Sequence, residues 1–262
     1  MKILVCVKQV PESDAPIKID TATGWILTEE ISGFKMNRLD EFAVEEAVLI
    51  KAEFNHTSIE VVTVGPDRSA AVVRRSIGMG ADSGAHIVTE FEKYQSSFEI
   101  AGRIAAYARD RTYDLILTGA MSEDNMQGQV GPMIAAQLDL PWATFVIFAK
   151  IADDEKTVYV EREIEGGCRD TLELQLPAVL TIQSGINTPR YPSLSNLLRA
   201  NRMELNKIQA GSLAQGASSE IIDRVAYPQK SRSGMVLKGT AEEKATQLIR
   251  ILREKALLPE GS

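Results

Sequence analysis

Four short apolar runs rich in β-branched residues alternate with helix-like segments in the first half of the chain. The runs lie at residues 3–7, 59–64, 85–88 and 114–118. Continuous apolar runs of this length are typical of strands that are buried on both faces of a parallel sheet. The helix-like segments lie at 40–50, 67–77, 97–110 and 129–138. Because parallel strands need crossover connections, the alternation predicts an α/β domain with right-handed crossovers.

The sequence pattern changes after Pro141. Residues 156–164 and 170–176 each alternate apolar and polar side chains, and the turn-like residues 165–167 (EGG) lie between them. Two alternating segments around a glycine-rich turn predict an antiparallel hairpin. Residues 179–182 form one more continuous apolar run and are expected to be another buried strand.

The remaining segments decide the domain organisation. A short hairpin is indicated around residues 23–25 (TGW). Residues 185–235 have little periodicity, whereas 239–257 carry the apolar stripe of an amphipathic helix. We therefore expect a compact nucleotide-binding α/β domain over residues 1–190. Residues 191–262 are expected to form an extension that docks on a partner.

Charge and residue counts exclude several functions. The 262-residue chain has a formal net charge of −7, which argues against a nucleic-acid partner. Two cysteines without a CxxC motif and only two histidines favour neither a disulfide framework nor a metal site. The apolar N-terminal segment has no small-residue cleavage site and is interpreted as a strand, not a signal peptide. A reducing, cytoplasmic location is expected.

The loop after the fourth apolar run is the best candidate for ligand binding. It leads from a strand into a helix, where glycines permit close backbone approach and the helix N-terminus offers N–H groups to an anion. It has neither a Gly-Lys-Ser/Thr motif nor GxGxxG, and an ordinary connection is the alternative. The candidate residues of the loop are Gly119, Ser122, Asp124, Asn125, Gln127, Gly128, Gln129, Val130 and Gly131.

Three other positions bear on the same site. Val64 ends the second apolar run and is a candidate for a second wall of the crevice. Asn37 lies just before a predicted helix, where capping that helix is favoured over hydrogen-bonding a nucleotide base. Cys6 lies inside the first run, where an inert buried thiol is expected. Because no residues combine a nucleophile, a base and an orienting group, we expect no catalytic residue.

Several motifs of the chain occur together in one known family. They are ILVCVKQVPE, NRLDEFAVEEA, VGPD, GMGAD, GQVGP and the stretch over residues 160–194. With them the chain resembles the β subunit of electron transfer flavoproteins over essentially its whole length. The resemblance implies an adenine-nucleotide-hydrolase-like (Rossmann-like) fold and a heterodimer with a larger α subunit, on which the C-terminal extension packs.

The resemblance also implies cofactors and electron partners. This chain would bind AMP, and the α subunit would hold most of the site for a redox-active FAD. In electron-bifurcating relatives a second FAD takes the place of AMP, and NADH is oxidised. Electrons would come from flavin dehydrogenases such as acyl-CoA dehydrogenase and pass to a membrane quinone oxidoreductase or another acceptor. The chain would then be an electron-carrier subunit, not a self-sufficient enzyme.

The family's AMP site maps onto three regions of this sequence besides Val64. They are Cys6, the segment Asn37, Arg38, Leu39 and Asp40, and the loop at 119–131. Arg38 and Leu39 stand where mitochondrial members have a proline and a phenylalanine. That phenylalanine lies near the flavin, so the departure puts a flavin contact from this chain in doubt.

Partner recognition maps onto two other places. The family's recognition loop corresponds to roughly residues 183–200, with Leu194 in the place of its anchoring leucine and Tyr191 beside it. Arg162 and Glu163 match a hairpin pair near the flavin and partner surface, and a solvated cross-strand charge pattern is the alternative for them.

Two alternative hypotheses place the chain outside this family, in classes of protein that have a similar fold. A nucleotide-dependent ligase is disfavoured because its SGGxDS loop is missing after the first strand. A stand-alone nucleotide-binding stress or signalling protein is disfavoured by residues 191–262, which are expected to need a partner.

Overall fold

The computed structural model describes the chain except residues 21, 90–94, 214, 215, 217, 219, 221, 229–233, 256 and 258–262. Contacts within the chain divide it into two units, Met1–Val225 and Ala226–Ser262. The division thus follows Val225, whereas the boundary predicted from the sequence follows residue 190. Docking of the extension on a partner stays a prediction.

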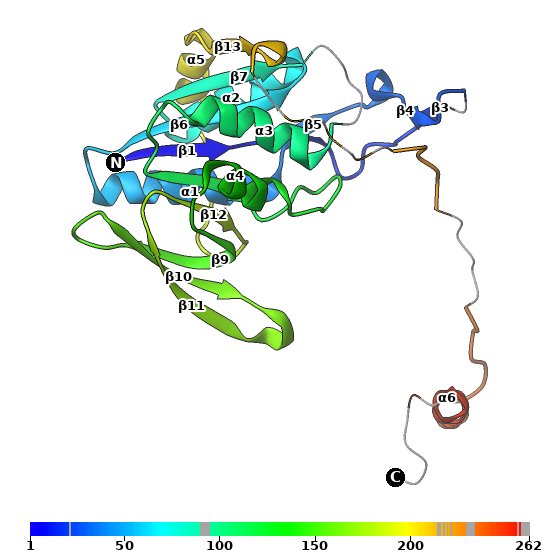
Figure 1. Ribbon diagram of the computed structural model, residues 1–262. Coiled ribbons are helices and arrows are strands. Elements are labelled where there is room, and N and C mark those ends of the chain that lie inside the picture. Colours follow the sequence, from blue (N-terminus) through cyan, green and yellow to red (C-terminus); the bar gives the residue numbers. More distant parts are fainter. Residues whose placement is uncertain are drawn as a thin grey trace. The chain divides into compact units, whose positions relative to one another are not determined.

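A nine-stranded sheet forms the centre of the first unit (Figure 1). Its order is β11-β10-β9-β12-β8-β1-β6-β7-β13. The strands are β1 Lys2–Cys6, β6 Ser58–Gly65, β7 Ser83–Val88, β8 Leu115–Gly119, β9 Trp142–Ile151, β10 Thr157–Glu163, β11 Arg169–Gln175, β12 Ala178–Ile182 and β13 Asn206–Gln209. β10 is antiparallel to β9 and β11, and the other neighbouring pairs are parallel. The predicted α/β class with an antiparallel hairpin is confirmed.

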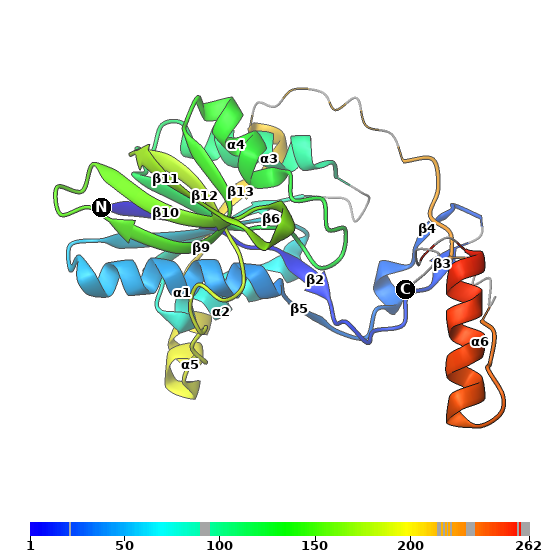
Figure 2. The same ribbon diagram turned by 90° about the horizontal axis from the view of Figure 1, so that it is seen from below.

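Strand β1 shows why continuous apolar runs predict this sheet. Successive side chains of a strand point to opposite faces, so Ile3 and Val5 join one hydrophobic cluster while Leu4 and Cys6 join the other. Helices cover both faces in Figure 2: α1 (Arg38–Glu53) and α2 (Ala70–Met79) lie on one side, and α3 (Ser97–Ala108) and α4 (Val130–Leu138) on the other.

Glycines with positive φ form the two predicted hairpin turns. Gly166 and Gly167 between β10 and β11 have φ of +77° and +71°. Gly24, with φ of +65°, lies between β3 (Ile19–Asp20) and β4 (Trp25–Ile26). Side chains with a Cβ rarely adopt this conformation, which explains the residue type at both turns.

Four features of the first unit are absent from the sequence-based predictions. They are the ribbon of β2 (Gln9–Pro11) and β5 (Phe34–Met36), strand β9, helix α5 (Leu194–Arg202) and strand β13. In β9 the alternation is interrupted because Phe145 has a positive φ of 55°. α5 packs against α2, and β13 pairs with β7 at the edge of the sheet.

The second unit contains helix α6 (Ala241–Glu254), which confirms the predicted C-terminal helix. A capping box starts it: Glu243 N donates to Thr240 Oγ1, and the Thr240 N donates to the Glu243 carboxylate. Leu248 and Ile249 on this helix are exposed. In the part of the chain that the structure describes, no helix has the length and apolar composition that a membrane span needs.

Candidate nucleotide-binding site

The site lies where two neighbouring parallel strands, β1 and β8, end. The chain leaves β1 toward α1 on one face of the sheet and leaves β8 toward α4 on the opposite face. Open α/β sheets bind ligands at the carboxyl ends of the strands where the chain diverges in this way. The loop at 119–131 and the start of α1 meet at this switch point, where Gly119 N donates to the Asp40 carboxylate.

Asp40, in the first turn of α1, joins three segments at the switch point. Its buried carboxylate accepts hydrogen bonds from Lys8 N at 2.7 Å, Asn37 Nδ2 at 2.9 Å and Gly119 N at 3.1 Å. Burial raises the pKa of Asp40 to about 7, although these donors act in the opposite direction. A Cβ at Gly119 would collide with the carboxylate, so glycine is required there by packing.

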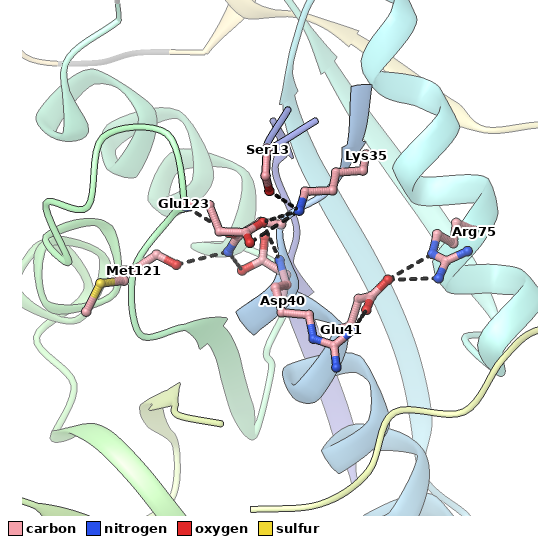
Figure 3. A network of polar contacts seen from close by, with 9 residues as sticks. Ser13, Lys35, Asp40, Glu41, Arg75, Met121 and Glu123 are labelled. Carbon is pink, nitrogen blue, oxygen red and sulfur yellow. Dashed lines mark hydrogen bonds and ion pairs between the residues drawn. The ribbon is translucent and has the colours of Figure 1, made fainter. Parts of the chain in front are cut away.

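Asn37 connects the start of α1 to the loop. Its Nδ2 donates to Met121 O at 3.0 Å, and its Oδ1 accepts from Glu123 N at 3.0 Å. It occupies the N-cap position of α1, but its side chain accepts no hydrogen bond from the helix backbone. The expected capping role is therefore wrong: the side chain is directed to the loop instead. Figure 3 shows this network around Asp40, Met121 and Glu123.

The loop has further polar contacts on its outer side. Lys8 Nζ lies 2.7 Å from the Asp124 carboxylate and 3.2 Å from Ser122 Oγ, and Ser122 in turn donates to Asn125 Oδ1 at 2.6 Å. Gln127 Oε1 accepts from the hydroxyl of Ser97 at the start of α3 at 2.7 Å. Lys8 is a further candidate residue of this site that was not predicted from the sequence, although its place directly after the first apolar run indicated this edge of the sheet.

The start of α4 supplies hydrogen-bond donors. Within the described residues, no side chain caps this helix at its N-cap residue, Gln129. Pro132 has no N–H, so the first-turn donors are the amides of Val130 and Gly131. Gly131 also permits close packing, since a Cβ there would meet the side chains of Thr118 and Thr181. Uncapped first-turn amides suit a phosphate.

The other mapped positions lie around the same edge. Cys6 is buried at the end of β1, and burial raises the pKa of its thiol, which therefore stays protonated and inert. Val64 is half-buried near the end of the adjacent β6. Arg38 is exposed, and its N donates to the Glu123 carboxylate at 3.3 Å, whereas Leu39 is half-buried.

The mapped recognition residues lie on other elements. Tyr191 and Leu194, just before and at the start of α5, are 87% and 74% exposed. At the end of β10, Arg162 pairs with Asp170 across the hairpin at 3.0 Å, and the Glu163 carboxylate accepts from Gln183 Nε2 at 3.5 Å. The cross-strand charge pair is thus present, and a role of Arg162 and Glu163 in recognition stays a prediction.

Fold and site together define a Rossmann-like α/β protein with a candidate phosphate site at the switch between β1 and β8. Comparison with known proteins agrees: residues 24–213 match the model of the electron transfer flavoprotein domain. The chain is 31% identical to the electron transfer flavoprotein subunit beta of Methylophilus methylotrophus, covering 97% of this chain and 98% of the relative. The subunit of Dictyostelium discoideum is 33% identical (98% and 99%), and that of Bos taurus 32% identical (92% and 94%). The chain belongs to the electron transfer flavoprotein β-subunit family.

Proposed function

We propose that this chain works in a heterodimer with a larger electron transfer flavoprotein α subunit, which holds most of the FAD site. The names of the relatives, all β subunits, support such a partner. The exposed side chains of Leu248 and Ile249 support it too, because an amphipathic helix needs a surface on which to bury its apolar side. In this proposal FAD supplies the redox chemistry, whereas the residues of this chain bind the nucleotide and the partner proteins.

We further propose that the nucleotide bound by this chain is AMP. The observation that carries this proposal is the uncapped start of α4, which follows a loop fixed by Asn37 and Asp40. The first-turn amides and the ammonium of Lys8 would hold the phosphate. The backbone at Cys6, Val64 and 37–40 would border the adenosine. The glycines that the fold requires at 119 and 131 keep the loop close to the strand ends.

The proposed electron donors are flavin dehydrogenases such as acyl-CoA dehydrogenase, and the proposed acceptor is a membrane quinone oxidoreductase or another carrier. Exposed Tyr191 and Leu194 support docking of a transient partner, because one apolar side chain in a pocket can anchor a complex. We place the heterodimer in the cytoplasm, since both cysteines, Cys6 and Cys168, are free thiols.

Counting the released nucleotides tests these proposals. The purified complex of this chain with its α subunit is denatured, and the nucleotides are separated and quantified. One FAD and one AMP per heterodimer are expected. Two FAD and no AMP, with flavin reduction by NADH alone, would overturn the AMP proposal and establish the electron-bifurcating alternative.

A further inference from the structure

Two consecutive glutamates in the middle of α1, Glu45 and Glu46, are buried, with exposures of 4% and 6%. Charged side chains are almost never buried in this way without partners. Their partners identify what this part of the helix does.

Both glutamates bind one short segment of the chain. The Glu45 carboxylate accepts from Arg190 three times: from the backbone N at 3.0 Å, from Nε at 2.8 Å and from an Nη at 2.8 Å. The Glu46 carboxylate accepts from Asn187 Nδ2 at 2.9 Å, and the same amide donates to Phe42 O at 3.0 Å. The segment 187–190 is therefore fixed on α1 at both of its ends.

A third acid of α1, Glu41, is connected through Arg75 to Tyr191, the residue that follows this segment. Glu41, one turn before Glu45, accepts from Arg75 of α2 at 2.8 and 3.1 Å, as Figure 3 shows. The Arg75 guanidinium lies 5.4 Å from the ring centre of Tyr191, within the range of a cation–π contact. We call Glu41, Glu45 and Glu46 the acidic row of α1.

On either side of this segment Ile186 packs on the hydrophobic core and Pro192 lies beside Gly78, whereas the residues between them are held through the acidic row. Residues 183–193, all of which the structure describes, contain no helix or strand. The following helix is fixed separately, because Arg74 of α2 donates to the carbonyls of Ala200, Asn201 and Met203 at its end. The acidic row therefore acts on the residues before α5. Glu45 is buried whereas the Arg190 side chain is 44% exposed, so the pair costs desolvation free energy mainly at the carboxylate. The best-attested use of a desolvated ionic contact is to specify one arrangement.

We infer that Glu45 is a positioning residue for partner docking: through Arg190 it holds the segment that presents Tyr191 and Leu194. The inference rests on the proposed function, in which this surface docks on a flavin dehydrogenase. Arg190 has two roles in the contact, since its guanidinium provides the charge and its backbone N–H fixes the path of the chain.

The test uses the complex with the α subunit and the variant Glu45→Gln. The matched control is Glu53→Gln, an exposed acid at the end of the same helix. Hydrogen exchange of the amides in 187–193 is expected to become about tenfold faster in Glu45→Gln, because one partner of a charge-assisted contact is weakened. The KM for the complex in reduction by an acyl-CoA dehydrogenase is expected to rise about tenfold with kcat unchanged. Arg190→Lys, which keeps the charge but loses the planar fork, should shift both measurements in the same direction.

A double-mutant cycle separates positioning from general destabilisation. If Glu45 acts by presenting Leu194, Glu45→Gln should raise KM by much less when Leu194 is already alanine. Equal effects in both backgrounds, or unchanged exchange in both Glu45→Gln and Arg190→Lys, would overturn the inference. If Leu194→Ala alone leaves KM unchanged, or the dehydrogenase does not reduce the wild-type complex, the proposed docking function fails. The exchange result still decides whether Glu45 holds the segment.

Discussion

Replacing Asn37 tests whether this residue connects the nucleotide loop to α1 or merely starts the helix. In Asn37→Ala three hydrogen bonds are lost: to the Asp40 carboxylate, to Met121 O and from Glu123 N. Neutral hydrogen bonds contribute about 1 kcal/mol each and one to a charged group about 2 kcal/mol. Partial replacement by water lowers the total, so we expect the free energy of unfolding to fall by about 2–4 kcal/mol.

Asn37→Ser is the informative companion variant. Serine is a good N-cap residue, so it can gain a hydrogen bond to the α1 backbone that Asn37 does not make, worth about 1 kcal/mol. It is too short to bridge Met121 and Glu123. Urea denaturation of the complex should show that serine recovers only part of the lost stability. If this chain binds AMP as we propose, the content of bound AMP should fall in both variants. Wild-type stability and nucleotide content in Asn37→Ser would refute the bridging role.

Three other outcomes are expected. Leu194→Ala should weaken productive docking roughly thirtyfold, about 2 kcal/mol, without changing flavin content; unchanged kinetics across dehydrogenase concentrations would remove Leu194 from the docking surface. The chain expressed without an α subunit should be poorly soluble or incompletely folded, and a stable monomer with α6 amides protected from exchange would contradict this. Burial raises the pKa of Asp40 from its ordinary value of 3.8 to about 7 in the folded chain, so its contribution to stability is full below pH 3.8 and is lost as the pH rises toward 7. Asp40→Asn should remove this slope, at most about 1.4 kcal/mol per pH unit, and denaturant midpoints measured from pH 4 to 8 check it.

The architecture could be predicted where burial shapes the local sequence. β1 is buried on both faces, so its sequence is a continuous apolar run. The glycines at 166 and 167 identify the turn between β10 and β11. β9 shows no alternation of apolar and polar residues, because exposed positions of this strand carry Trp142 and Phe148, and it was missed although residues 142–149 are mostly apolar.

The site was predicted from resemblance and loop composition, but its internal connections were not. Lys8 contacts Asp124, and Glu45 contacts Arg190, over separations of 116 and 145 residues. No local periodicity encodes such pairs. The role of Asn37 was misjudged for a related reason: an asparagine before a helix is normally a cap, and only the folded loop reveals its other partners.

Strand β13 has a consequence for synthesis of the chain. Asn206 pairs with Ala85, so the outer edge of β7 lacks its partner until nearly all of the first unit has been made. An open edge strand is a template for pairing with other chains. Because the N-terminal part of a chain is synthesised first, β7 leaves the ribosome before β13. With the α subunit supplied to both, we therefore expect chains that end at residue 205 to aggregate more during translation than chains that extend through β13. Light scattering of the cell-free reactions measures the difference. Pairing of β13 therefore determines when the outer edge of β7 is no longer open to pairing with other chains.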